Sequence, residues 1–142
     1  MFSTCMPTLH VSDVDSSARF YTEVLGLKLA ERYGNHWASV QAGSVKIGLH
    51  PASAQNPAGR NGSMTVGFAA VDGLEETVRK LEARGVSFPY GIQNDKGGKF
   101  ALFSDPDGHS LFLYEITQQE NAGDLEATSD QRGLEPSEST SR

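Results

Sequence analysis

Two stretches of the chain repeat the same order of apolar and polar positions. An apolar run ending at Asp13 leads into a helix-like segment that stops at Gly26, and a second run ending at Asp72 leads into one that stops at Gly85, over the same interval. Alternating apolar and polar residues follow each glycine, as expected for strands. A repeat of this length predicts two similar modules that pack together and share a cavity.

The first copy predicts one strand, one helix and three further strands. The first strand is expected near 4–12, and Asp13 or Asp15 is placed to cap a helix that Gly26 ends. Aspartate side chains accept hydrogen bonds from free N–H groups at a helix start, and glycine adopts the left-handed conformation that ends a helix. The remaining strands are expected at 27–33, 36–42 and 45–50.

The second copy predicts the same order of elements. A strand near 64–71 precedes a helix near 73–84 that has acidic residues in its first turn and basic residues later, which suits the helix dipole. Further strands are expected at 86–93, 99–104 and 110–116. The Asp-Pro-Asp-Gly sequence at 105–108 predicts a turn between the last two. Each copy is therefore a βαβββ unit, and the fold class is α+β.

Length and composition predict a single folded domain over 1–116, followed by a tail. Within it we expect module one at 4–50, a linker rich in Pro, Asn, Ala and Gly at 51–62, and module two at 63–116. The segment 117–142 is acidic, lacks aromatic residues and has little apolar surface. Such a composition predicts a disordered tail.

Charge and cysteine content exclude several classes of function. The net charge is −6 and the folded part has no basic stripe, so we expect no nucleic-acid partner. No apolar run approaches the ~18 residues that a membrane span needs, and the start of the chain lacks the order of a secretory signal. A lone Cys5 forms no internal disulfide, which favours a cytoplasmic location.

Two separated motifs together resemble a known family. The strand ending in Val11-Ser12-Asp13, the helix sequence Ser17–Tyr21 with Val24-Leu25-Gly26-Leu27 after it, and the later segment Phe103–Leu111 are similar to the vicinal oxygen chelate superfamily. This group includes glyoxalase I, extradiol dioxygenases and bleomycin resistance proteins. The resemblance covers about 4–116 and implies two paired βαβββ modules that form a curved mixed-sheet cup, commonly in a homodimer.

The resemblance also implies where a metal would bind. In metal-using members, four strand positions supply His, Glu or Gln to one divalent ion, and here these positions fall on Met6, Gly48, Val66 and Phe112. None of these side chains suits a hard or borderline ion. We therefore expect no metal and no cofactor, and place the chain with the metal-free, drug-binding type of member.

The expected ligand is an apolar or aromatic small molecule, such as an antibiotic or another natural product, because an aromatic floor favours a flat guest. The sequence also allows Phe112 simply to fill the cup as core. The residues expected to contact the ligand are Met6, Thr8, His10, Trp37, Gly48, His50, Val66, Phe68, Phe112 and Tyr114.

An enzymatic alternative stays open at this point. Strand alternation turns His10 and His50 into the cup, where two imidazoles can act as acid and base near neutral pH. The chain would then be a glyoxalase-like lyase or isomerase, or a dioxygenase-type enzyme with an atypical metal site. His36 and His109 lie beside turns, and we expect structural or surface roles for them.

Overall fold

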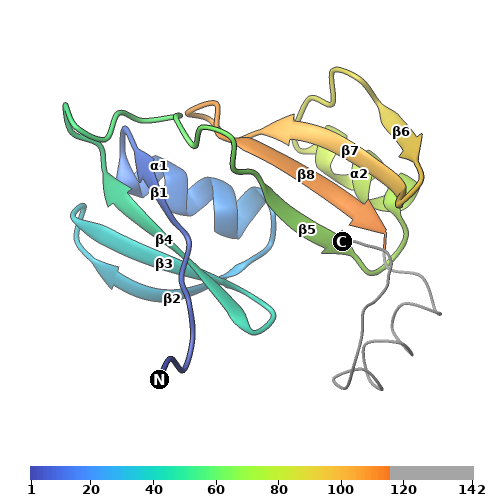
Figure 1. Cartoon of the computed structure of the whole chain (residues 1–142). Coiled ribbons are helices and arrows are strands. Elements are labelled where there is room, and N and C mark those ends of the chain that lie inside the picture. Colours follow the sequence, from blue (N-terminus) through green and yellow to red (C-terminus); the bar gives the residue numbers. More distant parts are fainter. Residues whose placement is uncertain (116–142) are drawn as a thin grey trace.

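The computed structural model describes residues 1–115, which form two modules of one topology joined by a linker (Figure 1). The N-terminal module consists of β1 (Thr8–Val11), α1 (Val14–Arg19), the π-helical segment η1 (Phe20–Val24), β2 (Lys28–Tyr33), β3 (Trp37–Ala42) and β4 (Val45–Pro51). The C-terminal module consists of β5 (Val66–Ala70), α2 (Leu74–Ala83), β6 (Ile92–Asp95), β7 (Gly98–Ser104) and β8 (Ser110–Glu115).

Each module contains one mixed four-stranded sheet within the described residues. The strand orders are β1-β4-β3-β2 and β5-β8-β7-β6, and the first strand of each module runs parallel to its last. This arrangement confirms the α+β fold of two βαβββ units. The tail expected at 117–142 lies outside the described residues. Among the described helices, none combines the length and apolar character needed to cross a membrane.

The first helix is capped by Asp13, one of the two capping candidates that the sequence offers. The Asp13 carboxylate accepts hydrogen bonds from the N–H and Oγ of Ser16 at 2.8 and 2.7 Å and from the Asn35 side chain at 3.1 Å. These bonds, with Ser16 contributing most, lower the pKa of Asp13 to about 2. The helix is not uniformly α-helical, because its last turn widens into η1, where the Leu25 N–H bonds to the Phe20 carbonyl.

Two strands are shorter than expected. The first runs from Thr8 to Val11 instead of over 4–12, and the one expected at 86–93 begins only at Ile92. Val86 and Phe88 are buried all the same, but their backbone is irregular. Pro89 follows with no N–H to donate to a ladder, so the strand starts only beyond this point.

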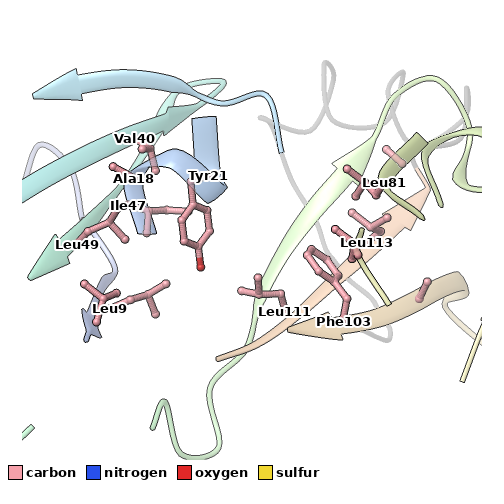
Figure 2. Close-up of a cluster of buried hydrophobic side chains, with 14 of the residues drawn as sticks. Leu9, Ala18, Tyr21, Val40, Ile47, Leu49, Leu81, Phe103, Leu111 and Leu113 are labelled. Carbon is pink, nitrogen blue, oxygen red and sulfur yellow. The ribbon is translucent and has the colours of Figure 1, made fainter. Parts of the chain in front are cut away.

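Each sheet buries one face against its own helix (Figure 2). This buried side includes Leu9, Val11, Ile47 and Leu49 in the N-terminal module and Ala101, Phe103, Leu111 and Leu113 in the C-terminal module. Because side chains alternate along a strand, the residues between these point the other way. We call the side of each sheet that lies away from its helix the open face.

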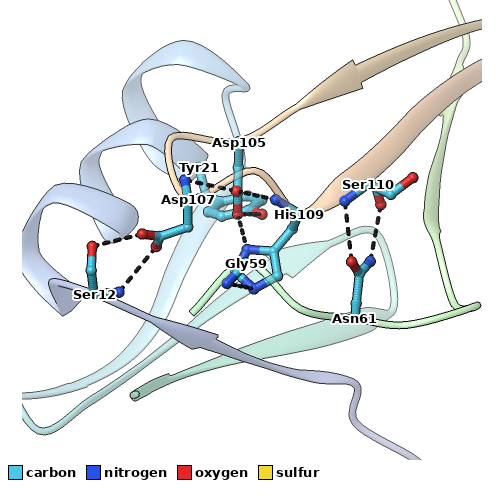
Figure 3. Close-up of polar contacts among 8 residues, drawn as sticks. All are labelled: Ser12, Tyr21, Gly59, Asn61, Asp105, Asp107, His109 and Ser110. Atoms are coloured by element: carbon cyan, nitrogen blue, oxygen red, sulfur yellow. Dashed lines mark hydrogen bonds and ion pairs between the residues drawn. The ribbon is translucent and has the colours of Figure 1, made fainter. Parts of the chain in front are cut away.

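The turn at Asp105–His109 ties the two modules and the linker together (Figure 3). The buried Asp105 carboxylate accepts hydrogen bonds from the Tyr21 hydroxyl and the His109 Nδ1–H, both at 2.7 Å. The Gly59 N–H donates to His109 Nε2 at 3.2 Å, so the proton of this imidazole lies on Nδ1. Burial first, and the nearby Asp105 charge second, raise the pKa of Tyr21, which keeps its phenol protonated as a donor.

Two further side-chain contacts cross this junction. The Asp107 carboxylate accepts from the N–H and Oγ of Ser12 at 3.1 and 2.6 Å. The Asn61 amide of the linker bonds to both the N–H and the carbonyl of Ser110, each at 3.3 Å. The Asp-Pro-Asp-Gly turn is therefore the polar joint between the modules.

Candidate functional site

The open face of the N-terminal sheet gathers two histidines and the single tryptophan. Parallel pairing places Thr8 opposite Gly48 and His10 opposite His50. The ring centroids of His10 and His50 lie 5.5 Å apart, and those of Trp37 and His50 lie 6.4 Å apart. These rings form a half-exposed cluster across three neighbouring strands, β1, β4 and β3.

Hydrogen bonding defines the chemical state of His50. Its Nδ1 lies 2.8 Å from the carbonyl oxygen of Pro51, and a carbonyl only accepts hydrogen bonds. The proton is therefore on Nδ1, and Nε2 keeps a lone pair that accepts a hydrogen bond or a proton. His50 is exposed, so this nitrogen is accessible to a small molecule.

Gly48 is covered by an aromatic ring. A β-carbon added at residue 48 would overlap the six-membered part of the Trp37 indole and lie 2.8 Å from Oγ1 of Thr8. The indole thus rests on bare backbone and takes the space that any side chain at this position would need. Glycine at this place is a packing requirement of the ring.

On the open face of the C-terminal sheet, an aromatic ring also covers a glycine. Phe112 covers Gly67, where an added β-carbon would overlap its ring and come within 2.7 Å of Cε2. Phe112 also packs against Tyr114 with ring centroids 5.9 Å apart. Together with Phe100 and Leu102 they line a hollow of about 510 Å³. Sequence reasoning missed Phe100 and Leu102, although both alternate with the buried Ala101 and Phe103.

The strand register corrects part of the expected site. Val66 lies opposite Leu111 and Phe68 opposite Leu113, so both point to the helix side and pack against the core. The expectation that they line the same surface as Phe112 and Tyr114 is wrong. The internal repeat would have shown this error. The position that precedes Asp72 by the same interval as Met6 precedes Asp13 is Thr65, so Thr65 rather than Val66 is the equivalent of Met6.

The residues present do not fit the divalent metal that the resemblance implies. Met6 offers a thioether and is 41% exposed ahead of β1, Gly48 offers no donor, Val66 faces the core and Phe112 offers a ring. Hard and borderline ions need nitrogen or oxygen ligands. Within residues 1–115, no group of three or more His, Cys, Asp or Glu is placed to hold an ion.

A third feature lies where the modules meet. A cavity of about 320 Å³ opens between β1, the linker and the start of β5, and we call it the junction cavity. His10 borders this cavity as well as belonging to the ring cluster. The residues that line it are Pro7, Thr8, Leu9, His10, Arg60, Asn61, Met64, Val66 and His109.

Comparison with known proteins gives one family and several relatives. The family model described as Glyoxalase/Bleomycin resistance protein/Dioxygenase superfamily matches residues 4–113. An uncharacterized protein of Mycolicibacterium smegmatis is 30% identical over 110 residues, which cover 77% of this chain and 90% of that protein.

Solved structures share the fold. TnmS3, an antibiotic binding protein from Streptomyces sp. CB03234, is 27% identical with a TM-score of 0.68, over 81% of this chain and 96% of that one. A glyoxalase/bleomycin resistance protein from the same organism is 29% identical with a TM-score of 0.64, over 79% and 99%. A lactoylglutathione lyase from Agrobacterium tumefaciens, at 21% identity and TM-score 0.65 over 81% and 94%, is similar in fold alone.

Proposed function

Because the chain belongs to the Glyoxalase/Bleomycin resistance protein/Dioxygenase superfamily, we propose that it is a metal-independent binding protein for an apolar or aromatic small molecule. The observation that carries this proposal is the aromatic ring over each open-face glycine, Trp37 on Gly48 and Phe112 on Gly67. A half-exposed ring presents a flat apolar surface to a guest, and ring stacking adds about 0.5–1.5 kcal/mol per pair beyond buried area.

The same geometry supports metal independence. At Gly48 the chain has no ligand atom, and the Trp37 indole occupies the space where a longer side chain would have to pass. A carboxylate or imidazole at this position would first have to displace the ring. We therefore assign the binding energy to ring stacking and to hydrogen bonds from His10 and His50 rather than to a cation.

The ligand class follows from the surface and from one relative. Among residues 1–115, the ring contacts on the open faces join aromatic and imidazole groups, which suit planar molecules. TnmS3, 27% identical, is an antibiotic binding protein. We extend this class to the present chain and propose an aromatic antibiotic or natural product as its ligand, with sequestration as the activity.

One observation favours an enzyme as a second candidate. His50 has its Nδ1–H fixed by the Pro51 carbonyl and its Nε2 free, and His10 lies beside it. An imidazole fixed in this way, here that of His50, can take a proton from a bound substrate while the imidazole of His10 returns one. The reaction would be of the lyase or isomerase type.

A homodimer completes the proposal. Within the described residues, β1 and β5 each pair on one side only, so both sheets keep a free edge. An apolar groove of about 510 Å³ runs along β5 and past Leu25, Leu27 and Val45. A second copy would cover these surfaces. Sedimentation velocity should give the mass of two chains, and a single-chain mass at micromolar concentrations would contradict the dimer.

Trp37 provides a direct test of binding, since it is the only tryptophan. Titration with a panel of aromatic antibiotics and natural products should give saturable quenching of its fluorescence, unchanged by a chelator. His10→Ala and His50→Ala should weaken binding, since both rings lie beside Trp37, while His36→Ala, in an exposed turn, should not. No saturable quenching by any compound would contradict the binding proposal, and loss of binding on chelation would contradict metal independence.

Mass spectrometry of the bound compound separates the two candidate functions. Recovery of the unchanged compound supports a binding protein. Conversion that disappears in His10→Ala and in His50→Ala, but persists in His36→Ala, would replace it by the enzyme.

A further inference from the structure

The junction cavity contains a positive charge that forms no ion pair with any other residue of 1–115. Among residues 1–115, the other arginines each have a partner: Arg19 and Arg32 pair with Asp15, Arg79 with Glu76, and Arg84 donates to the Val24 carbonyl. Arg60 is the one arginine of residues 1–115 that makes neither a hydrogen bond nor an ion pair within this part of the chain. It lines the cavity from the linker and is exposed to solvent.

No acidic side chain within the described residues lines this cavity. The two carboxylates behind its wall are already satisfied, because Asp105 accepts from Tyr21 and His109, and Asp107 accepts from Ser12. Both carboxylates keep their negative charge, but their lone pairs are directed to these donors and neither side chain lines the cavity. Among the described residues that line the cavity, Arg60 is therefore the only one that is an arginine, a lysine or an acid.

The other polar groups of the wall are also committed. His109 uses Nδ1–H on Asp105 and Nε2 on the Gly59 N–H, and the Asn61 amide bonds to Ser110. This leaves Arg60, with its planar fork of donors, the half-buried His10 and the Thr8 hydroxyl to meet a ligand. His10 also touches the ring cluster through His50, so one molecule can contact both places.

We propose that the junction cavity is an anion subsite, in which Arg60 binds the carboxylate, sulfonate or phosphate of a ligand whose aromatic part lies on His10, His50 and Trp37. This inference rests on the proposed binding function and narrows its ligand class to aromatic anions. A guanidinium binds such groups through two parallel hydrogen bonds, which are stronger than neutral ones. His10, between the two places, orients the anionic end of the molecule.

Two dyes that differ by one group test the subsite. Anilinonaphthalene sulfonate is anionic, and N-phenylnaphthylamine has the same rings without the sulfonate. Both are titrated against the full chain, with energy transfer from Trp37 as the signal. The variants are Arg60→Gln and, as a matched control, Arg79→Gln, which removes the same charge from an exposed helix position. Circular dichroism establishes that each variant is folded.

We expect the wild-type chain to bind the sulfonate about tenfold more tightly than the neutral dye. Arg60→Gln should bring this ratio to about one without changing the affinity for the neutral dye, and Arg79→Gln should leave it at about ten. Added salt should lower the ratio in wild type and not in Arg60→Gln.

The outcomes separate this inference from the proposed function. Saturable binding of the neutral dye with a ratio that Arg60→Gln does not change overturns the anion subsite and leaves the binding protein in place. An equal loss in Arg79→Gln assigns the effect to overall charge and overturns the subsite too. Failure of both dyes to bind near Trp37 overturns the two proposals together.

Discussion

At the scale of single residues, the open faces depend on glycines whose missing side chains make room for rings. A β-carbon at residue 48 would overlap the Trp37 indole. We predict that Gly48→Ala pushes the indole outward and costs about 1–3 kcal/mol, as overpacking does. Trp37 emission should shift to longer wavelength as the ring becomes more exposed, and urea unfolding should report the loss of stability.

The control for this prediction is Gly97→Ala. An added β-carbon at Gly97 would lie 3.4 Å from Oδ1 of Asp95, the nearest atom, and the backbone there is not left-handed. This variant should be close to wild type. In a Trp37→Ala background the cost of Gly48→Ala should nearly vanish, because the clash is with the ring. A cost that persists in this background would show that backbone strain, not the ring, requires glycine.

A second residue-scale prediction concerns Tyr21, whose hydroxyl donates to the buried Asp105 at 2.7 Å. Tyr21→Phe leaves this carboxylate short of one donor and should cost roughly 2 kcal/mol of unfolding free energy. Tyr90→Phe is the matched control, since Tyr90 is 67% exposed. Equal stability of the two variants in urea would mean that the hydroxyl contributes nothing net.

The sequence predicts the site in part, and the limits have physical causes. Alternation along β1 and β4 is enough to bring His10 and His50 to one face. Trp37 covers Gly48 from the neighbouring strand, so this contact depends on the register between β3 and β4, which no local sequence pattern shows. The sequence equally does not show that Arg60 lacks a partner within residues 1–115, because this depends on which carboxylates the fold brings near it.

At the scale of elements, the two copies of the repeat start their helices differently. Asp13 caps α1 through Ser16, whereas Asp72, its counterpart, has a 70% exposed side chain 4.0 Å from Lys80, and the N-cap of α2 is Gly73. We predict that Asp13→Ala lowers Tm at neutral pH and that Asp72→Ala barely changes it. A similar drop in both would contradict capping by Asp13.

The effect of Asp13 should depend on pH in one direction. Its pKa falls from 3.8 to about 2 in the folded chain, so its stabilisation is fully present above pH 3.8 and is lost as the pH falls through about 2. The difference in Tm between wild type and Asp13→Ala should therefore narrow over this range. A difference that stays constant down to pH 2 would contradict the assigned pKa.

Element boundaries follow from the sequence where periodicity decides them. Most strands and helices of both units lie near where alternation and the 3.6-residue pattern place them, because most of them bury one face. The exception is β2, which is exposed along nearly its whole length. The alternation at Val86 and Phe88 wrongly predicts a strand, because both side chains are buried although their backbone is irregular. The π-helical end of the first helix is also hidden, because apolar spacing does not distinguish it from one more α-helical turn.

At the scale of the whole molecule, the polar joint around Asp105–His109 holds the linker at Gly59 (Figure 3). Arg60 is the next residue, so its position depends on the same contact. A β-carbon at Gly59 would overlap the Asp107 carbonyl, so the linker backbone lies directly against the turn. The junction cavity exists because this contact holds the linker beside β1. The shape of the cavity therefore depends on His109, which belongs to the C-terminal module.

This coupling leads to a prediction for His109→Ala, which removes the acceptor of the Gly59 N–H and one donor to Asp105. Native-state hydrogen exchange should be faster at Gly59 and through the segment 52–65 between β4 and β5, while the strands of both sheets keep their protection. The preference for the anionic dye should fall as well, because Arg60 then samples many positions. His36→Ala, in an exposed turn, should change neither quantity. Unchanged exchange at Gly59 would show that the linker is held without His109, and would contradict the coupling between this histidine and the cavity.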